Sequence, residues 1–157
     1  MKKIVWFALF DLFLFTLAAN AQTLTPLVSE FNVRAGKTAR GSFKIQNNSL
    51  TPVAFTIEAD DFTLDRYGRH IQPLTSAEHV ALSPSSGRLG PKEIREIEFK
   101  ITCDTPRCEI VFRTAMVTGK TSQGLLVKVW LDHATYLAAS KHPRQDAMTA
   151  AGLIAKK

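Results

Sequence analysis

The sequence predicts a single all-β domain, an antiparallel sandwich of about seven short strands. Three observations lead to this prediction. Short runs rich in β-branched and aromatic residues alternate between apolar and polar positions. Clusters of glycine, proline, asparagine and serine separate these runs at regular spacing. No segment between positions 22 and 138 sustains the period of an α-helix.

The first 21 residues are expected to be a secretory signal peptide. A positive start, Met1–Lys3, precedes the apolar stretch Ile4–Leu17, and Ala19–Ala21 places small residues at a cleavage site before Gln22. The apolar stretch is shorter than the roughly 20 residues that span a bilayer, and Asp11 interrupts it. We therefore expect export to the periplasm and no stable membrane insertion of the mature chain.

The first half of the mature chain contains three strand-like runs. In the second and third runs apolar and polar residues alternate, which predicts one buried and one wet face. Asn47–Ser49 is a turn, although it also matches a glycosylation sequon. The runs are Thr25–Val33, Arg40–Gln46 and Val53–Asp60.

The second half continues the same pattern after an irregular stretch over residues 60–74. Proline and glycine mark loops at Ser83–Gly87 and Gly90–Pro91. Three further strands follow, over Glu96–Cys103, Glu109–Thr118 and Leu125–Leu131 or slightly beyond. The whole series is typical of an immunoglobulin-like sandwich over residues 22–140. Residues 141–157 are a short alanine-rich tail, helical or disordered.

Cys103 and Cys108 bracket a turn between two strands. In an oxidising compartment such a pair is expected to form a disulfide that clips the hairpin. A redox pair more often has a two-residue spacer, and a zinc site would need two further ligands at suitable spacing.

The charge of the chain is basic, +6, and loss of Lys2, Lys3 and Asp11 with the leader leaves +5. This excess favours acidic partners or membrane surfaces. The cations are scattered and do not interleave with aromatic residues, so we expect no binding of nucleic acid.

No combination of residues in the sequence predicts catalysis. The histidines are isolated, and neither a nucleophile elbow nor a phosphate-binding glycine loop is present. Asp60, Asp61 and Asp65 lack the glycine-centred loop of a calcium site, which favours an acidic turn. We expect a binding protein without metal or cofactor rather than an enzyme.

The last predicted strand is the most informative feature. Leu126, Lys128 and Trp130 lie on the face opposite to Val127, Val129 and Leu131, so apolar residues occur on both faces. Either the strand packs both faces within its own sandwich, or its edge pairs with an extended segment of another chain. We take Leu126, Lys128 and Trp130 as candidate partner-binding residues.

Four stretches of the chain, in order, resemble the N-terminal domain of the periplasmic pilus-assembly chaperones, the PapD-like family. They are a glycine turn with a strand ending in asparagine (Val33–Lys37 and Phe43–Asn47), a strand with an early proline (Pro52–Ile57), a Ser-Pro and Leu-x-Pro type loop (Leu82–Pro84 and Leu89–Glu93), and the strand that ends the domain (Gly124–Tyr136). The resemblance spans about residues 25–137. It implies an immunoglobulin-like domain that escorts exported subunits by lending them a strand.

The chain departs from that family in two respects. Family members normally carry a second β-domain, whereas this sequence ends after one. The family also anchors the C-terminal carboxylate of its client with an arginine and a lysine, where this sequence has Ser29 and His133. Arg34 and Lys128 are the nearby cations. Two functions remain open: a chaperone-like protein binding an exported pilus-type subunit, or a structural immunoglobulin-like module of a cell-envelope or surface assembly.

Overall fold

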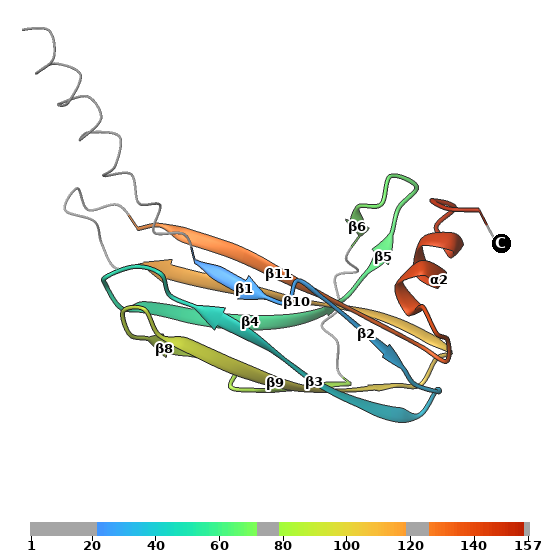
Figure 1. Ribbon diagram of the computed structural model, residues 1–157, viewed down its shortest axis with the longest axis horizontal. Coiled ribbons are helices and arrows are strands. Elements are labelled where there is room, and N and C mark those ends of the chain that lie inside the picture. The colour runs from blue at the N-terminus through green and yellow to red at the C-terminus, as the bar shows by residue number, and fades with distance from the viewer. Residues whose placement is uncertain (1–21, 72–78, 119–125, 156–157) are drawn as a thin grey trace, which may run out of the picture.

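Two β-sheets face each other in the computed structural model, which describes residues 22–71, 79–118 and 126–155 (Figure 1). The four-stranded sheet has the order β1-β3-β9-β7, and the five-stranded sheet has the order β2-β11-β10-β4-β8. The first sheet consists of β1 (Thr23–Thr25), β3 (Lys37–Gln46), β9 (Ile94–Cys103) and β7 (Val80–Ser83). The second consists of β2 (Val28–Asn32), β11 (Lys128–Ala138), β10 (Arg107–Thr118), β4 (Val53–Asp61) and β8 (Ser86–Leu89).

The sandwich confirms the all-β, immunoglobulin-like prediction. All pairings in the two large sheets are antiparallel except that of β2 with β11, which is parallel. The expected signal peptide and the loop before the last strand, residues 1–21 and 119–125, lie outside the described residues.

The strand count exceeds seven because β1, β7 and β8 lie largely outside the predicted runs, and β8 overlaps the loop predicted over Ser83–Gly87. Of the run predicted over Thr25–Val33, only Thr25 belongs to β1, which pairs with β3; the remainder contains β2, which pairs with β11 in the other sheet. Pro26 lies between them, and without a backbone N–H it cannot continue a ladder. In the same way, Pro84 separates β7 in one sheet from β8 in the other.

The last strand was predicted too early in the chain. It runs from Lys128 to Ala138 and pairs with β10 along its whole length, from Val117↔Lys128 to Arg107↔Ala138. Asp132 and His133 break the apolar pattern of the sequence, but the ladder to β10 keeps them in the strand. Leu126 and Val127 precede the strand.

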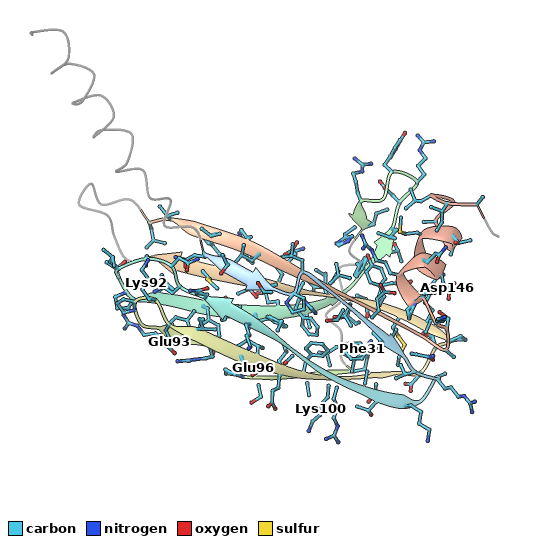
Figure 2. The ribbon with its side chains drawn as sticks, in the orientation of Figure 1. Phe31, Lys92, Glu93, Glu96, Lys100 and Asp146 are labelled. Atoms are coloured by element: carbon cyan, nitrogen blue, oxygen red, sulfur yellow. A yellow bond between two sulfur atoms is a disulfide. The ribbon has the colours of Figure 1, made fainter. Side chains whose placement is uncertain are left out.

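The core fills the space between the sheets with inward-facing side chains from both layers. Phenylalanine rings at its centre lie close together, with centroids of Phe99 and Phe112 separated by 4.7 Å. Figure 2 shows Phe31 pointing between the layers, while Glu96 and Lys100 point away from the four-stranded sheet. The largest fully buried side chains are Phe43, Phe55, Phe62, Phe99, Phe112, Ile45, Leu89, Ile97, Ile101, Ile110, Met116 and Leu137.

A second, smaller cluster lies on the outer face of the five-stranded sheet. Helix α2 (Pro143–Ala150) and the hairpin of β5 (Thr63–Leu64) and β6 (His70–Ile71) lie together at one end of the sandwich (Figure 1). The cluster consists of Phe62, Val111, Ala134, Tyr136 and Ala147. The backbone N–H of Arg144 donates to Glu30 at 3.0 Å, which ties the helix to β2. Residues 143–150 of the predicted tail are therefore helical and pack against the five-stranded sheet.

Candidate functional site

The two sides of β11 are not equally occupied. On one side β10 pairs with the entire strand. On the other side β2 pairs with Ala134–Ala138 only. Among the described residues no strand pairs with this side of Lys128–His133, although β1 passes close by while pairing with β3. We call Lys128–His133 the open edge.

The backbone groups that face outward along the open edge follow from strand geometry. The N–H of Ala134 donates to the Leu27 carbonyl at 2.9 Å, so Ala134 directs its backbone groups away from β10. N–H and C=O directions alternate along a strand. Lys128, Trp130 and Asp132 therefore present their N–H and C=O groups outward. The open edge spans about 20 Å and can accept one added strand.

Exposed apolar side chains are concentrated at the beginning of β11. Leu126 is 61 % exposed, Val127 is 45 % exposed and Trp130 is 47 % exposed. Leu27, where β2 meets the open edge, is 61 % exposed. Val129 and Leu131 are turned inward and partly buried. The structure thus places Lys128 and Trp130 on the open edge, with Leu126 exposed just before it; sequence reasoning missed Leu27, which is remote in the sequence.

Two cations flank the Trp130 ring. The Lys128 ammonium lies 4.1 Å from its centroid and the Arg113 guanidinium 5.8 Å from it. Arg113 also lies 4.0 Å from the carboxylate of Asp132, whose side chain is half exposed. The outer face of the open edge therefore combines an indole ring with charges of both signs, an arrangement common at protein interfaces.

His133, at the end of the open edge, is buried in an aromatic cage. Its ring stacks on Phe43 with a centroid distance of 4.9 Å, and Phe99 and Phe112 complete the cage. Its Nδ1 lies 2.7 Å from the Pro26 carbonyl. Because a carbonyl only accepts, Nδ1 carries the proton and donates. Burial lowers the pKa of His133, against the opposing effect of this hydrogen bond.

The carboxylate anchors of the PapD-like family have no counterpart at Ser29 and His133. Ser29 is paired with Thr135 in the β2–β11 ladder, and His133 is fully buried.

The Asn47–Ser49 turn is organised by a buried side chain. The Asn47 amide donates to the carbonyls of Thr51 and Gly90, each at 2.8 Å, and its oxygen accepts from the Ser49 hydroxyl at 2.7 Å. Asn47 is 0 % exposed, so its amide nitrogen is not available as a glycan acceptor.

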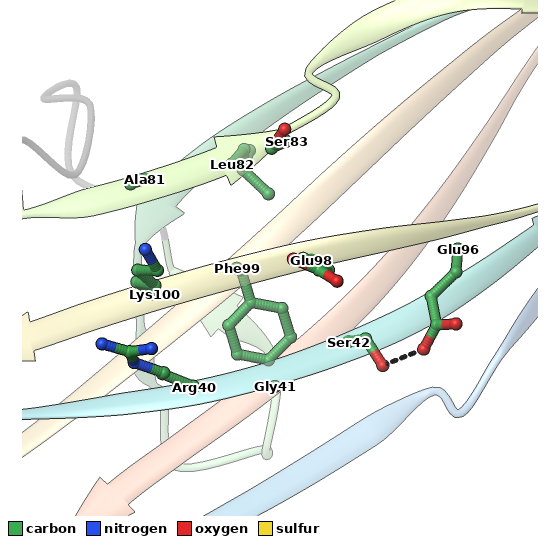
Figure 3. Close-up of a pocket in the computed structure, with 10 residues that line it drawn as sticks. All are labelled: Arg40, Gly41, Ser42, Ala81, Leu82, Ser83, Glu96, Glu98, Phe99 and Lys100. Atoms are coloured by element: carbon green, nitrogen blue, oxygen red, sulfur yellow. Dashed lines mark hydrogen bonds between the residues drawn. The ribbon is translucent and has the colours of Figure 1, made fainter.

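A shallow depression of about 630 Å³ lies on the outer face of the four-stranded sheet. Figure 3 shows charges of both signs spread along it, with the Ser42 hydroxyl donating to Glu96 at 2.5 Å. The lining side chains are those of a solvated sheet face, and no polar groups converge there.

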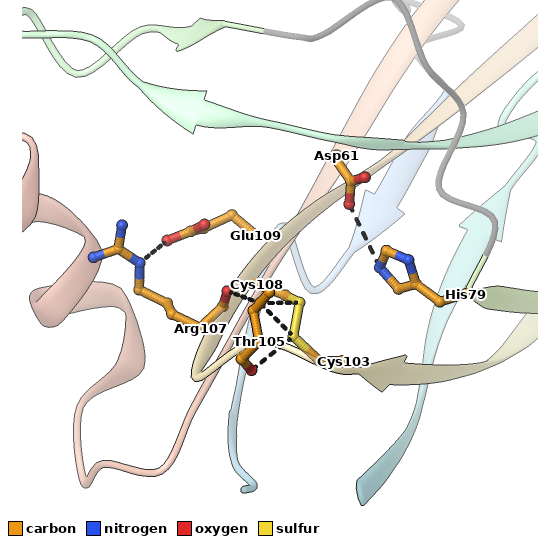
Figure 4. Close-up of a disulfide and its surroundings, with 7 residues drawn as sticks. All are labelled: Asp61, His79, Cys103, Thr105, Arg107, Cys108 and Glu109. Carbon is orange, nitrogen blue, oxygen red and sulfur yellow. Dashed lines mark hydrogen bonds and ion pairs between the residues drawn. A yellow bond between two sulfur atoms is a disulfide. The ribbon is translucent and has the colours of Figure 1, made fainter. Parts of the chain in front are cut away.

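The expected disulfide joins Cys103 and Cys108, between β9 and β10 (Figure 4). Nearby, Arg107 pairs with Glu109 at 2.7 Å and His79 with Asp61 at 3.5 Å. Burial raises the pKa of Glu109, although Arg107 opposes this.

Of the three aspartates predicted to form an acidic turn, Asp60 and Asp61 belong to β4, and only Asp65 lies in a turn, between β5 and β6. Asp65 accepts hydrogen bonds from the backbone N–H groups of Tyr67 and Arg69, and these bonds help to lower its pKa. Across the described residues no group of three or more His, Cys, Asp or Glu side chains could hold a metal ion. In the same part of the chain no helix is long and apolar enough to cross a bilayer.

Comparison with solved structures places the fold among PapD-like domains. Neither a protein-family model nor a curated protein matches the chain. A PapD-like domain of human CEP192 superimposes with a TM-score of 0.56 at 14 % identity, covering 77 % of this chain and 86 % of that one. The class 5 fimbriae chaperone CfaA gives 0.59 at 9 % identity, covering 76 % and 57 %.

A chain of the Salmonella enterica complex of the SafA pilin with the SafB chaperone gives 0.58 at 11 % identity, covering 77 % and 55 %. The protein therefore spans little more than half the length of the fimbrial chaperone chains that it matches. At this level of identity the similarity shows a PapD-like immunoglobulin fold.

Proposed function

We propose that this protein is a periplasmic chaperone-like protein that binds an exported, pilus-type subunit by β-strand addition along the open edge. The observation that carries the proposal is the row of outward backbone groups at Lys128, Trp130 and Asp132, beside exposed apolar side chains. Unprotected edges of this kind are a liability unless a partner covers them. Similar folds occur in a complex of a chaperone with a pilin and in a complex of a chaperone with a tip adhesin, which supports a protein partner.

In this proposal the open edge supplies affinity and Trp130 supplies a large part of the contact. An added strand would accept and donate hydrogen bonds at alternate residues of β11. Trp130, with Lys128 and Arg113 against its ring, would pack on the side chains of that strand. The alternative, a structural module of an envelope assembly, predicts that the mature chain has no stoichiometric client.

The test is co-purification of tagged mature chain from the periplasm of the exporting host. We expect a stoichiometric partner. Trp130→Ala should weaken its binding by about 2 kcal/mol or more, roughly a thirtyfold loss. Ile94→Ala is the matched control, since it removes an exposed apolar side chain from the other sheet.

A second variant tests the backbone contribution. Trp130→Pro removes one outward N–H. The hydrogen bonds to β10 stay in place because the N–H of Trp130 points away from β10, and proline is tolerated on a strand edge. We expect it to abolish co-purification while circular dichroism remains that of the sandwich. Partner binding that survives both substitutions at Trp130 would show that the open edge is not the binding site.

A further inference from the structure

We propose that the tip of the β5–β6 hairpin binds the anionic headgroups of a phospholipid surface. The hairpin tip is the turn Asp65–Arg69, with the sequence Asp-Arg-Tyr-Gly-Arg. It projects beyond the two large sheets, at the end of the sandwich where α2 lies (Figure 1). The strand that carries the open edge begins at the opposite end (Figure 1), and this inference does not depend on the binding of an exported subunit.

The conformation of the hairpin tip is fixed by the Asp65 side chain. Its carboxylate accepts hydrogen bonds from the backbone N–H groups of Tyr67 at 2.8 Å and Arg69 at 2.9 Å. The N–H of Gly68 donates to the Asp65 carbonyl at 2.9 Å, and Gly68 has a φ of 76°, a conformation that glycine adopts without strain. Because the backbone is already ordered, binding through the side chains costs little further backbone entropy.

The hairpin tip presents its cations to solvent and turns its anion inward. The Asp65 side chain is only 13 % exposed and lies 2.7 Å from Nε of Arg69, whereas the Arg69 side chain is 74 % exposed. The terminal N–H groups of this guanidinium remain available as donors. Arg66 is exposed, and no ion pair joins it to another of the described residues. Since guanidinium groups bind phosphate oxygens in a bidentate manner, both arginines are suited to lipid headgroups.

A tyrosine between the two cations supplies an amphipathic contact. Tyr67 is 64 % exposed, and the guanidinium carbons of Arg66 and Arg69 lie 4.7 and 5.1 Å from the centroid of its ring. Tyrosine is enriched at the level of lipid headgroups, because its ring is apolar and its hydroxyl is polar. Ile71 in β6 adds a second exposed apolar side chain. The combination matches the border between phosphates and acyl chains.

The shape of the hairpin tip favours a broad surface over a small ligand or a peptide. Small ligands bind in concave sites, and peptides bind in grooves or along sheet edges, whereas this turn projects from the fold (Figure 1). The basic excess of the chain adds long-range attraction toward an anionic bilayer. We expect the association to be weak and sensitive to salt, because the tip contributes only Arg66 and Arg69 as cations.

The experiment is flotation of the mature chain, with its disulfide intact, on vesicles at low ionic strength. Vesicles of equal parts phosphatidylglycerol and phosphatidylcholine are compared with vesicles of phosphatidylcholine alone. We expect the protein to float with the anionic vesicles only, and added salt to release it. Equal binding to both kinds of vesicle, or binding to neither, overturns the proposal. Binding of soluble polyglutamate without binding of vesicles also overturns it and indicates an acidic protein partner instead.

Arg66→Ala tests whether the hairpin tip is the site, and Arg40→Ala is the matched control. Arg40 is an exposed arginine on the outer face of the four-stranded sheet, so both variants remove the same charge from the chain. Arg66→Ala should lower the vesicle partition coefficient about fivefold, which corresponds to about 1 kcal/mol for one cation at an anionic surface. The control should change it about twofold or less, because a charge farther from the bilayer interacts more weakly. Equal losses for both variants would show that net charge alone binds the vesicles.

The double variant Tyr67→Trp, Trp130→Phe reports on the environment of the hairpin tip. Trp130 is replaced because it is the only tryptophan outside the expected leader. We expect a blue shift of the emission when anionic vesicles are added, and circular dichroism checks that each variant is folded. Unchanged emission from a protein that still floats with the vesicles would place the contact elsewhere. Neither result affects co-purification of a subunit through the open edge, so the two proposals fail independently.

Discussion

Replacement of Asn47 by alanine tests how the turn that follows β3 is held together. The side chain is fully buried and connects three parts of the chain. Its amide donates to Thr51 and Gly90 at 2.8 Å, and its oxygen accepts from the N–H and the hydroxyl of Ser49 at 3.0 and 2.7 Å. Asn47→Ala removes these four bonds and leaves carbonyls in a poorly hydrated region.

A net value of about 1 kcal/mol for each bond gives a loss of about 4 kcal/mol in the free energy of unfolding. This is a large part of the roughly 5–15 kcal/mol that stabilises a domain. Asn47→Asp should be at least as harmful, because it places a carboxylate oxygen against two carbonyls in place of the amide donors.

The assay is urea unfolding of the mature chain with the disulfide intact, and Asn32→Ala, on the exposed side of β2, is the control. The control should change the free energy of unfolding by less than about 0.5 kcal/mol. A loss below about 1 kcal/mol for Asn47→Ala, with an unchanged denaturant slope, would refute this view of the turn.

Three further predictions concern stability. Burial lowers the pKa of His133, so the unfolded chain takes up the proton first; the free energy of unfolding should fall below about pH 6.5 by up to about 1.4 kcal/mol per pH unit, and His133→Phe should reduce this slope. Equal slopes for both proteins in urea unfolding at pH 5–7 would contradict the assignment. Gly41→Ala should cost about 1–3 kcal/mol in the same assay, because a Cβ there would lie 2.6 Å from Phe99 and 2.7 Å from Phe31; an unchanged midpoint would show that the rings give way freely. Reduction of the Cys103–Cys108 disulfide should cost about 2 kcal/mol, seen as a lower thermal midpoint with reductant, because it closes only a short loop; a midpoint insensitive to reductant would contradict this.

The alternating runs of the sequence were sufficient to predict the sandwich and most of its strands. Phe43 and Ile45 in β3, and Ile97, Phe99 and Ile101 in β9, face the core as a period of two requires. The pairing of Cys103 with Cys108 was also predictable, because only a turn separates them. These features depend on neighbours in the sequence, and local patterns report them.

The boundaries of β11 and the placement of its ends depended on contacts from distant parts of the chain. Asp132 and His133 belong to the strand because β10 pairs with them, and His133 is buried because Phe43, Phe99 and Phe112 surround it. The period of two could not show this, since a histidine in a strand is equally compatible with solvent.

The sequence by itself determined an all-β domain, its approximate strands, and a last strand with apolar residues on both faces. Only the tertiary structure decided that Lys128–His133 is open, because this depends on where β2 begins to pair with β11. That point is set by Pro26 and Leu27, more than a hundred residues earlier in the chain, where the backbone leaves one sheet and joins the other. A strand pattern specifies which face of a strand is buried, whereas the occupancy of its edge is a property of the assembled sheet.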